Sequence, residues 1–562
     1  MSSSANKTLA DRIIKASFIV GIAHICLKFA GLIQVKFATQ FLDASLYEPI
    51  MVVAFTGVIN SLFLIGEEVI GPTFLSLFMK EKETKDEKAA WHFTNIVLTF
   101  QSLVLIAVIS SIVCFPDFYI GLFTKWTEAE DPSRYRLLRQ SLQVLAPALF
   151  FLSLGSTTYM LLNGYKKFFL AAFGDASTKV CIILGLVIGM KVFGLDYRAL
   201  FLGILFGSAA KTLTHAVGLA KRLRYLRPSL DWRNPAFRTM LLLMLPLLAG
   251  IIFAKVRDNF NNIYILTHID QKGILMANDL GRKLFATIQW LVPYALQIAL
   301  FPFLCELVSQ RDREKLGMVL GSSCKLLLAV FVPAAVLLFV LGRPISVLIF
   351  LGGKTGIELA SWAGLSTACY CLVLPAAAVE CVLMQGYFAD QRTVSVTVIG
   401  VLSSMFSVML SYIYIVFVGV TPQGALVVVA LGFVISRCLK SAALAIYLER
   451  STPMFHRRDI SVFFFKLAVL SIAVGAVTWL VSTGVDKVFP DGISKALEQL
   501  GSGSDVHISR VRIAMRIVIA GAAGGIVYLA GSFALRLAEP RQMIMWAVEK
   551  VLKKKNATAS AS

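Results

Sequence analysis

Residues 241–266 read LLLMLPLLAGIIFAKVRDNFNNIYIL, an apolar run that is long enough to cross a lipid bilayer. A spanning helix needs about 20 mostly apolar residues, because a rise of 1.5 Å per residue must cover roughly 30 Å of hydrocarbon. Lys255, Arg257 and Asp258 interrupt the run near its middle. A charge at that depth is costly unless it faces a partner or a wet cavity, so these three side chains cannot all face lipid. The run therefore predicts a transmembrane helix that borders a polar pathway.

Similar runs fill the chain almost from end to end. The composition agrees, because 57% of the 562 residues are hydrophobic and only 15% are charged, which leaves too little polar surface for a soluble globule. We therefore predict an all-α polytopic membrane protein with about 14 transmembrane helices. The runs lie approximately at residues 17–42, 49–79, 93–115, 137–163, 168–193, 197–220, 237–266, 283–308, 316–342, 361–387, 393–419, 423–448, 461–483 and 511–536.

The formal net charge is +21, and its distribution predicts the topology. Lys and Arg gather in alternate loops, and such an asymmetry places the basic loops in the cytoplasm. With an even number of spans, both termini are expected to be cytoplasmic. The positive charge thus follows from topology, and we predict no nucleic-acid partner. The basic segments are residues 7–15, 80–88, 166–167, 221–233, 311–315, 450–458 and 541–555.

The chain also repeats itself weakly. The second run ends with Gly71-Pro72-Thr73-Phe74-Leu75 and the eighth with Phe301-Pro302-Phe303-Leu304, while the first and seventh carry Lys28 and Lys255 at similar depths. Two halves of six spans followed by two extra spans is the simplest division, and transporters built from repeats bind substrate near the midplane. The predicted segments are a cytoplasmic N-terminus (1–16), an N-lobe (17–220), a basic cytoplasmic linker (221–236), a C-lobe (237–448), a final pair of spans (461–536) and a basic cytoplasmic tail (537–562).

Lys28 and Lys36 lie in the first run. They are eight residues apart, a little over two helical turns, so both ammonium groups lie near one face. Either they serve a pathway, or their stems reach the two membrane surfaces. The second alternative suits Lys36 better, because Lys28 is far inside the run.

The seventh and eighth runs add further cations. Asp258 can neutralise either Lys255 or Arg257, which still leaves one positive charge. Arg282 and Lys283 begin the eighth run, either as substrate ligands or as interfacial anchors. With Lys28 and Lys36, these residues form a cationic set that suits a phosphate or pyrophosphate group, because ammonium and guanidinium groups form charge-assisted hydrogen bonds with such anions. The expected ligand is anionic.

Acidic residues inside the runs are candidates for gating. Glu67 and Glu68 follow Gly66 in the second run, and they either pair with Lys28 or Lys36 in one conformation or carry a coupling proton or cation. Glu380 has the same two interpretations. Asp175 and Lys179 are four residues apart on one helix, a spacing that favours a structural ion pair.

Motifs for catalysis or metal binding are not found in the sequence. No Gly-rich loop ends in Gly-Lys-Ser or Gly-Lys-Thr, so we expect no ATP hydrolysis. The six His residues are scattered, and no His, Cys and carboxylate cluster has ligand spacing. We therefore predict a protein that is not an enzyme and that has no cofactor and no metal site.

Several short segments, from about residue 12 to residue 450, occur in a characteristic order and spacing. They are Phe29-Ala30-Gly31-Leu32, Met51-Val52-Val53-Ala54-Phe55 followed by Glu67 and Phe74, Leu161-Leu162-Asn163-Gly164 with Ala172-Phe173, Pro246, Ala277 to Lys283 leading to Pro302, Ile349 to Gly353, and Gly386-Tyr387-Phe388-Ala389. In the order and spacing of these segments the chain resembles the MurJ/MviN family of lipid II flippases, within the multidrug/oligosaccharidyl-lipid/polysaccharide exporter superfamily.

The resemblance implies two six-helix lobes around a central cationic cavity and a final helix pair that forms a groove for a polyprenyl tail. It places Lys28 at the family's first essential Arg and Lys283 at the Arg of the eighth span. This chain departs from the family at Gln34 and Leu62, where the family typically has Arg, and at Pro49, where it has Asp. We therefore describe the chain as a divergent member, in which Lys36, Lys255 and Arg257 are hypothesised to restore the positive charge.

The implied function is an alternating-access flippase in the cytoplasmic (inner) membrane of a bacterium. It would move a polyprenyl-pyrophosphate-linked saccharide, in the first place the peptidoglycan precursor lipid II, from the inner to the outer leaflet. The expected partners are this lipid, membrane lipids and other proteins of cell-wall synthesis. The alternatives are a same-fold exporter of an O-antigen or exopolysaccharide lipid intermediate or of a drug, and a scaffold that does not transport. A cationic cavity disfavours a cationic drug.

Overall fold

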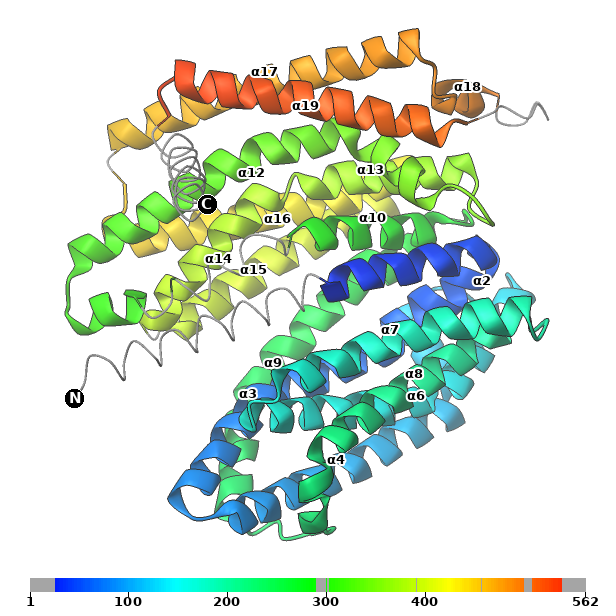
Figure 1. The fold of residues 1–562 in the computed structure, drawn as a ribbon, viewed down its shortest axis with the longest axis vertical. Coiled ribbons are helices and arrows are strands. Elements are labelled where there is room, and N and C mark those ends of the chain that lie inside the picture. The colour runs from blue at the N-terminus through cyan, green and yellow to red at the C-terminus, as the bar shows by residue number, and fades with distance from the viewer. Residues whose placement is uncertain are drawn as a thin grey trace, which may run out of the picture. The chain divides into compact units, whose positions relative to one another are not determined.

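The computed structural model describes residues 26–289, 300, 303–390, 392–455, 457–499 and 508–537, which are mostly helical (Figure 1). Among these residues, eleven helices are long and apolar enough to cross a membrane, or twelve if a bent pair counts as one span. Two of the expected runs, 17–42 and 283–308, extend into residues outside the described ranges. The predicted all-α polytopic membrane fold is confirmed.

The chain divides into two compact units. The N-terminal unit extends to Lys283 and includes Gly352–Gly356 and Val408–Ala425, and the C-terminal unit contains Leu284–Leu351, Ile357–Ser407 and the chain from Leu426 onward. The seventh span is thus grouped with the first six by its contacts. The division into two six-span lobes at residues 17–220 and 237–448 stays a prediction, since it concerns sequence repeats and function, whereas the two units are defined by contacts.

Six long helices dominate the N-terminal unit, in which α7 and α8 run side by side (Figure 1). Short or irregular helical segments connect them, and α10 continues beyond this unit. The helical elements are residues 26–41, α2 (Ala44–Tyr47), a π-helical segment (Glu48–Ile59), α3 (Asn60–Thr84), α4 (Glu87–Cys114), α5 (Pro116–Phe123), α6 (Pro132–Gly164), α7 (Phe168–Lys191), α8 (Arg198–Leu219), a 3₁₀ turn (Ala220–Tyr225), α9 (Pro235–Asn259), two short segments (Phe260–Tyr264 and Ile265–His268) and α10 (Ile274–Gln289).

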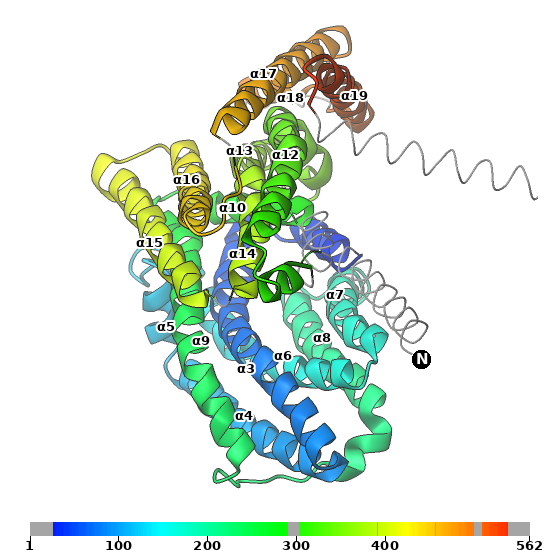
Figure 2. The same cartoon turned by 90° about the vertical axis from the view of Figure 1, so that its left-hand side faces the viewer.

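The C-terminal unit is built around the long helix α12, and its last two long helices, α17 and α19, lie side by side (Figures 1 and 2). Its elements are α12 (Arg313–Phe350), α13 (Ile357–Cys371), α14 (Leu374–Ala389), most of α15 (Thr393–Tyr412), most of α16 (Pro422–Glu449), α17 (Arg457–Val488), α18 (Ile493–Glu498) and α19 (Arg510–Ala534). The last turn of α15, the π-helical segment that follows it (Ile413–Val418) and the first turn of α16 belong to the N-terminal unit.

The run expected as one span at 361–387 is broken. Helices α13 and α14 meet at an angle of 42° across Leu372 and Val373. Pro375 lies in the first turn of α14. Since proline has no backbone N–H and its ring crowds the preceding turn, a continuous helix through this position is disfavoured. Hydropathy alone does not detect such a break.

Several helix starts are set by local sequence. The side chains of Asp86, Asp131 and Asp312 accept hydrogen bonds from backbone N–H groups in the first turns of α4, α6 and α12, at 2.7, 3.0 and 3.0 Å. A side-chain acceptor at this position satisfies an N–H group that has no partner within its own helix. Each of these acids lies four to seven residues before an apolar run begins, so the capped helices start ahead of the runs at 93–115, 137–163 and 316–342.

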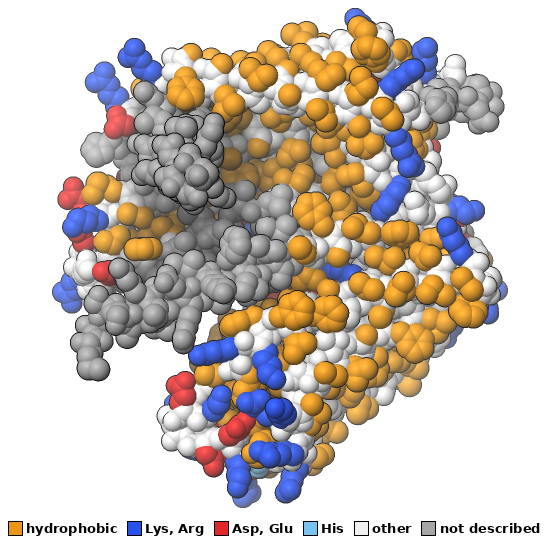
Figure 3. All heavy atoms as spheres, viewed as in Figure 1, with side chains coloured by type: hydrophobic (Ala, Val, Ile, Leu, Met, Phe, Trp, Pro, Cys, Tyr) orange, Lys and Arg blue, Asp and Glu red, His pale blue; other side chains and the backbone are white. Residues whose placement is uncertain are grey.

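Large apolar side chains on the outer faces remain uncovered. Leu242, Phe206, Val217 and Ile472 are each exposed by 66% or more of their surface. Figure 3 shows hydrophobic side chains along the visible helix surfaces, and Lys and Arg gathered near the end of the N-terminal unit where α3 ends and α4 begins. Such extensive apolar surface would promote aggregation in water. It is the surface expected of helices that face lipid.

We expect the contact between α7 and α8 to depend on two glycines. A β-carbon on Gly185 would lie 2.6 Å from the Cα atom of Gly203, which is a backbone atom and cannot move aside easily. Gly185→Leu is expected to destabilise the protein by about 1–3 kcal/mol, the usual cost of overpacking. The matched variant Gly250→Leu in α9, where no atom lies within 4 Å, should have little effect. Thermal unfolding midpoints in detergent check this, and equal midpoints for the two variants would contradict it.

Candidate functional site

A polar pocket of about 290 Å³ lies within the N-terminal unit. The helical residues 26–41, the π-helical segment and helices α3, α6, α7 and α8 all contribute side chains. Three lysines and one aspartate line it, a formal balance of two positive charges at membrane depth. The lining residues are Leu27, Lys28, Gln34, Phe55, Asn60, Phe63, Leu152, Asp175, Thr178, Lys179, Ile182 and Lys211.

Lys211 of α8 is the most deeply buried of the three lysines, with 4% of its side chain exposed. Its Nζ atom lies 2.7 Å from the carboxylate of Asp175 on α7 and 5.0 Å from the centre of the Phe63 ring. The stem of Lys211 crosses α6 at Gly155, where a β-carbon would lie 3.0 Å from its Cδ and Cε atoms. A side chain at position 155 would therefore have to displace the stem of Lys211 by a few tenths of an ångström.

Lys179 of α7 occupies a similar gap next to the first described helix. Its Nζ atom lies 3.4 Å from the position that a β-carbon on Gly31 would take. Lys28, Gly31 and Gln34 are spaced by three residues, so they share the helix face that borders the pocket. A β-carbon on Gly31 would make only an ordinary van der Waals contact with Lys179, whose ammonium group lies beside this face between Lys28 and Gln34.

Asp175 and Lys179 were expected to form an ion pair with each other. The structure instead gives Asp175 an ion pair with Lys211, and both residues of the expected pair line the pocket. The i,i+4 spacing places them near one another, but Lys211 from the adjacent helix is the residue in contact with the carboxylate. Glu67 of α3 lies beside Ser156, and its carboxyl group interacts electrostatically with Lys211 and Asp175.

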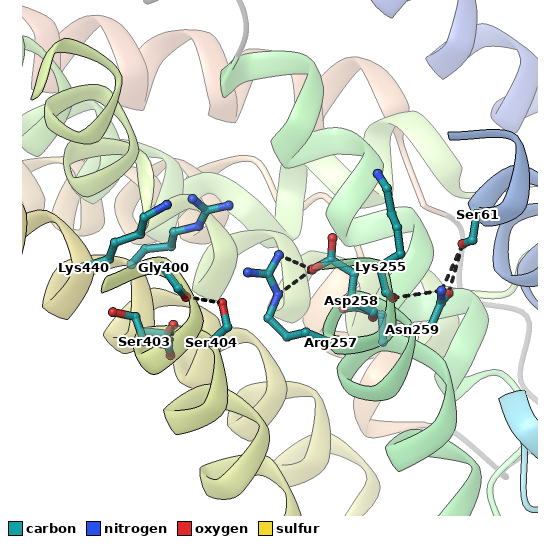
Figure 4. Close-up of polar contacts among 12 residues, drawn as sticks. Ser61, Lys255, Arg257, Asp258, Asn259, Gly400, Ser403, Ser404 and Lys440 are labelled. Carbon is teal, nitrogen blue, oxygen red and sulfur yellow. Dashed lines mark hydrogen bonds and ion pairs between the residues drawn. The ribbon is translucent and has the colours of Figure 1, made fainter. Parts of the chain in front are cut away.

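The two cations of α9 that interrupt the seventh run have acidic partners within the same unit, and Asp258 is one of these partners. Lys255 Nζ lies 2.6 Å from the carboxylate of Glu68. Arg257 donates from Nη2 and Nε to Asp258 at 2.6 and 2.9 Å (Figure 4). Next to them, Asn259 Nδ2 donates to Ser61 Oγ at 3.0 Å. The positive charges of Lys255 and Arg257 are thus each balanced by a contacting carboxylate in this conformation.

Lys283, at the start of the eighth run, forms an ion pair with Asp279 at 2.7 Å. The same carboxylate accepts a hydrogen bond from the hydroxyl of Tyr47 at 2.8 Å, so α2 and α10 are joined through it. Glu48 is buried and accepts the backbone N–H of Met276 at 3.1 Å, which satisfies the start of α10. Lys36 and Arg282 are each partly buried in the same unit.

Glu380 lies in the C-terminal unit. Its side chain is 6% exposed and lies between two cations of α16, at 2.7 Å from Arg437 and 2.6 Å from Lys440. Lys440 Nζ lies 3.6 Å from the position of a β-carbon on Gly400 of α15, which Figure 4 shows beside Ser404. One carboxylate with two cations leaves a formal positive charge in this cluster.

Sequence reasoning missed the cations at Lys211, Arg437 and Lys440. Each lies inside an apolar run, which was the signal used for Lys28 and Lys255, so a full scan of the runs for charged residues would have found them. Lys179 was noticed but interpreted as structural. The acid Asp279, which contacts Lys283, was also overlooked.

Multiple membrane-spanning helices around an intramembrane cationic pocket define the class of a polytopic membrane transporter. A family model described as lipid II flippase MurJ matches residues 38–493. The chain therefore belongs to the MurJ lipid II flippase family, and as a member of it the chain is a transporter and not an enzyme.

Similar proteins agree with this assignment. The probable lipid II flippase MurJ of Borreliella burgdorferi is 24% identical over 350 residues, which cover 62% of this chain and 67% of that protein. The probable lipid II flippase MurJ of Haemophilus influenzae is 22% identical over 433 residues, covering 74% and 82% of the two chains.

Two solved structures share the fold. A lipid II flippase MurJ in an inward closed conformation superposes with a TM-score of 0.69 at 19% identity, covering 92% of this chain and 99% of that one. An inward-facing multidrug resistance MATE family transporter of the MOP superfamily reaches a TM-score of 0.60 at 13% identity, covering 77% and 98%. At these identities the likeness concerns the fold.

Proposed function

We propose that this chain flips a polyprenyl-pyrophosphate-linked saccharide, in the first place lipid II, across the cytoplasmic membrane of a bacterium. Family membership supports the reaction class and a role in peptidoglycan synthesis. The single structural observation that supports the ligand class is the pocket lined by Lys28, Lys179 and Lys211 with only Asp175 as an acid. Ammonium groups in a poorly hydrated site form strong hydrogen bonds with phosphate oxygens.

In this proposal Lys179 and Lys211 supply the positive charge that is missing at position 34 of the pocket. Gln34 lines the same pocket at a position where the family typically has Arg, and an amide cannot contribute charge. Two lysines from α7 and α8 stand within the same cavity as Gln34 and provide it instead. Lys28 is the residue shared by this pocket and by the cationic set expected from the sequence.

The other expected ligands are proposed to act when their acids release them. Lys255, Arg257 and Lys283 contact Glu68, Asp258 and Asp279 in this conformation. A pyrophosphate group could replace each carboxylate as the cation's partner, since both are anionic acceptors. The acids would then act as gates that hold the cations while no substrate is bound. Lys36, Arg282, Glu67 and Glu380 remain candidates for the same roles.

We further propose that both termini are cytoplasmic. The linker around Arg222 and Arg233 and the start of α4 around Lys85 and Lys88 carry the positive charge expected of cytoplasmic segments. Interaction with other proteins of cell-wall synthesis is an expectation that follows from the family's role.

Complementation of cells depleted of their own lipid II flippase tests the proposed site. Lys28→Met with Lys179→Met keeps two apolar stems and removes two charges, and we expect growth rescue to fall at least tenfold, because each lost charge-assisted hydrogen bond costs about 1.5–3 kcal/mol. Lys125→Met, which alters an exposed loop lysine, is the control and should rescue normally.

Membrane levels of the variants must be equal for this comparison. Full rescue by the double variant would contradict the site. Rescue without any lipid II reaching the outer leaflet, measured with an added lipid II-cleaving enzyme that acts only outside, would favour the non-transporting scaffold and contradict transport.

A further inference from the structure

A second cavity of the N-terminal unit lies outside the site described above. It has a volume of about 490 Å³ and is bounded by α4, α6, α8 and the linker that follows α8. Most of its wall is apolar, and one cation, Arg227, lines it. We refer to this cavity as the lipid slot. Its lining residues are Trp91, Asn95, Leu98, Thr99, Ser102, Leu103, Leu154, Thr158, Leu161, Thr212, Ala216, Leu219, Leu223, Leu226, Arg227 and Pro228.

The hydroxyl groups in the wall of the lipid slot do not make it polar. Ser102 donates to the carbonyl of Leu98 at 2.7 Å, Thr158 to that of Leu154 at 3.0 Å, and Thr212 to that of Phe151 at 2.7 Å. In each case the hydroxyl donor is satisfied by a backbone carbonyl group of a helix, as is common for Ser and Thr in helices. The surface that the slot presents to a ligand is therefore mainly apolar.

The length of the slot matches one leaflet of a bilayer. Along α4 its lining runs from Trp91 to Leu103, a distance of about 18 Å at 1.5 Å per residue. Half of the roughly 30 Å hydrocarbon core is about 15 Å. A single extended acyl chain of one leaflet thus fits the slot from end to end.

Arg227 lies in the wall of the slot, and the linker segment that carries it is held by α4 on both sides of this residue. Asn95 Nδ2 donates to the carbonyl of Tyr225 at 2.8 Å, and the backbone N–H of Ser229 donates to Thr99 Oγ1 at 3.0 Å. Both anchors come from α4, and Arg227 lies between the two tethered residues. Its side chain is exposed, and within the described part of the chain no hydrogen bond or ion pair engages its guanidinium group.

Two neighbouring cations of the linker, Arg222 and Arg224, have partners of their own. Arg222 donates to the carboxylate of Glu87 at 2.9 Å and stacks on the ring of Tyr165 at 3.9 Å. Burial raises the pKa of Tyr165 to about 12, so its phenol stays neutral and donates to Glu87 as well. Arg227 is the one cation among the residues that line the slot, so it is the cation placed to receive an anion there.

We propose that the lipid slot binds one anionic phospholipid, with an acyl chain between α4, α6 and α8 and the phosphate on Arg227. In the orientation proposed above, the basic linker places this lipid in the inner leaflet, where anionic headgroups attract such segments. The bound lipid belongs to the membrane and is distinct from the transported substrate. The bound lipid would contact both the linker and helices α4, α6 and α8, and so stabilise the position of the linker against them.

Native mass spectrometry of the purified full chain tests this site. The probes are phosphatidylglycerol, zwitterionic phosphatidylethanolamine and a polyprenyl phosphate, added to delipidated protein. We expect one phosphatidylglycerol to be retained in preference to phosphatidylethanolamine. Arg227→Ala should lower its retention about fivefold, the size expected for one arginine at an anionic surface. Ala216→Phe, which fills the slot, should lower it as well.

Arg224→Ala is the matched control, since Arg224 carries the same charge on the same linker but does not line the slot. It should retain the lipid as the unmodified chain does. Equal losses in Arg224→Ala and Arg227→Ala would show attraction by linker charge alone and overturn the site. Equal retention of both phospholipids, or displacement of phosphatidylglycerol by the polyprenyl phosphate, would overturn it too. Lipid retention is measured without transport, so the outcome is independent of the complementation test.

Discussion

Glu380→Ala is expected to destabilise the protein by about 3–5 kcal/mol, because it leaves two cations inside the membrane without their carboxylate. Glu380 is 6% exposed and contacts both Arg437 and Lys440. The side chains of these cations are 28% and 15% exposed, so neither can move fully into water without distorting α16. A loss of this size is a large part of the total stability of most proteins.

The measurement is the free energy or midpoint of unfolding in detergent. Glu358→Ala is the control, because Glu358 of α13 is an exposed carboxylate in the same unit. A triple variant in which Arg437 and Lys440 also become methionine should recover most of the lost stability, since apolar groups of similar volume commonly replace buried ions without penalty. A triple variant no more stable than Glu380→Ala would show that the charges are not the cause.

The second expected result concerns the ion pair of Asp175 and Lys211, and it is asymmetric. Asp175→Asn should destabilise the protein by about 3–5 kcal/mol, since it leaves the nearly buried ammonium of Lys211 without its carboxylate. Lys211→Met should cost less, roughly 1–2 kcal/mol, because the side chain of Asp175 is 34% exposed and can be hydrated from the pocket. The difference in burial thus predicts which partner is the more sensitive.

Unfolding of the two single variants and of the double variant measures this asymmetry and the coupling between the residues. The double variant should be more stable than Asp175→Asn alone. Asp196→Asn serves as the control, because the ion pair of Asp196 with Arg198 is exposed and long, at 3.9 Å. Exposed pairs contribute about 0–1 kcal/mol. Equal losses for Asp175→Asn and Lys211→Met would be evidence against the burial argument.

The helices were predictable because each one is determined by its own stretch of sequence. An apolar run of sufficient length must be helical in a bilayer, since every backbone polar group has to find its partner within the segment. The runs expected at 168–193 and 423–448 correspond closely to α7 (Phe168–Lys191) and α16 (Pro422–Glu449). Where the backbone departs from one continuous helix, as between α13 and α14, hydropathy carries no information.

The candidate site was only partly predictable. Lys28 and Lys255 were identified as costly charges, since the cost of a charge at membrane depth depends on its place in its own run. The partner of each charge depends on neighbouring helices. Glu68 lies against Lys255 although the two are 187 positions apart in the chain.

Composition, hydropathy and the placement of Lys and Arg were enough to establish a polytopic helical membrane protein and to mark some of its intramembrane charges. Which cations share a cavity was a matter of helix packing, which brings Lys179 of α7 and Lys211 of α8 beside Lys28 around one pocket. The physical reason is that hydrocarbon solvation acts on each segment separately. Ion pairing and cavity formation depend instead on the approach of side chains from different helices, as where the stem of Lys211 passes close to Gly155 of α6.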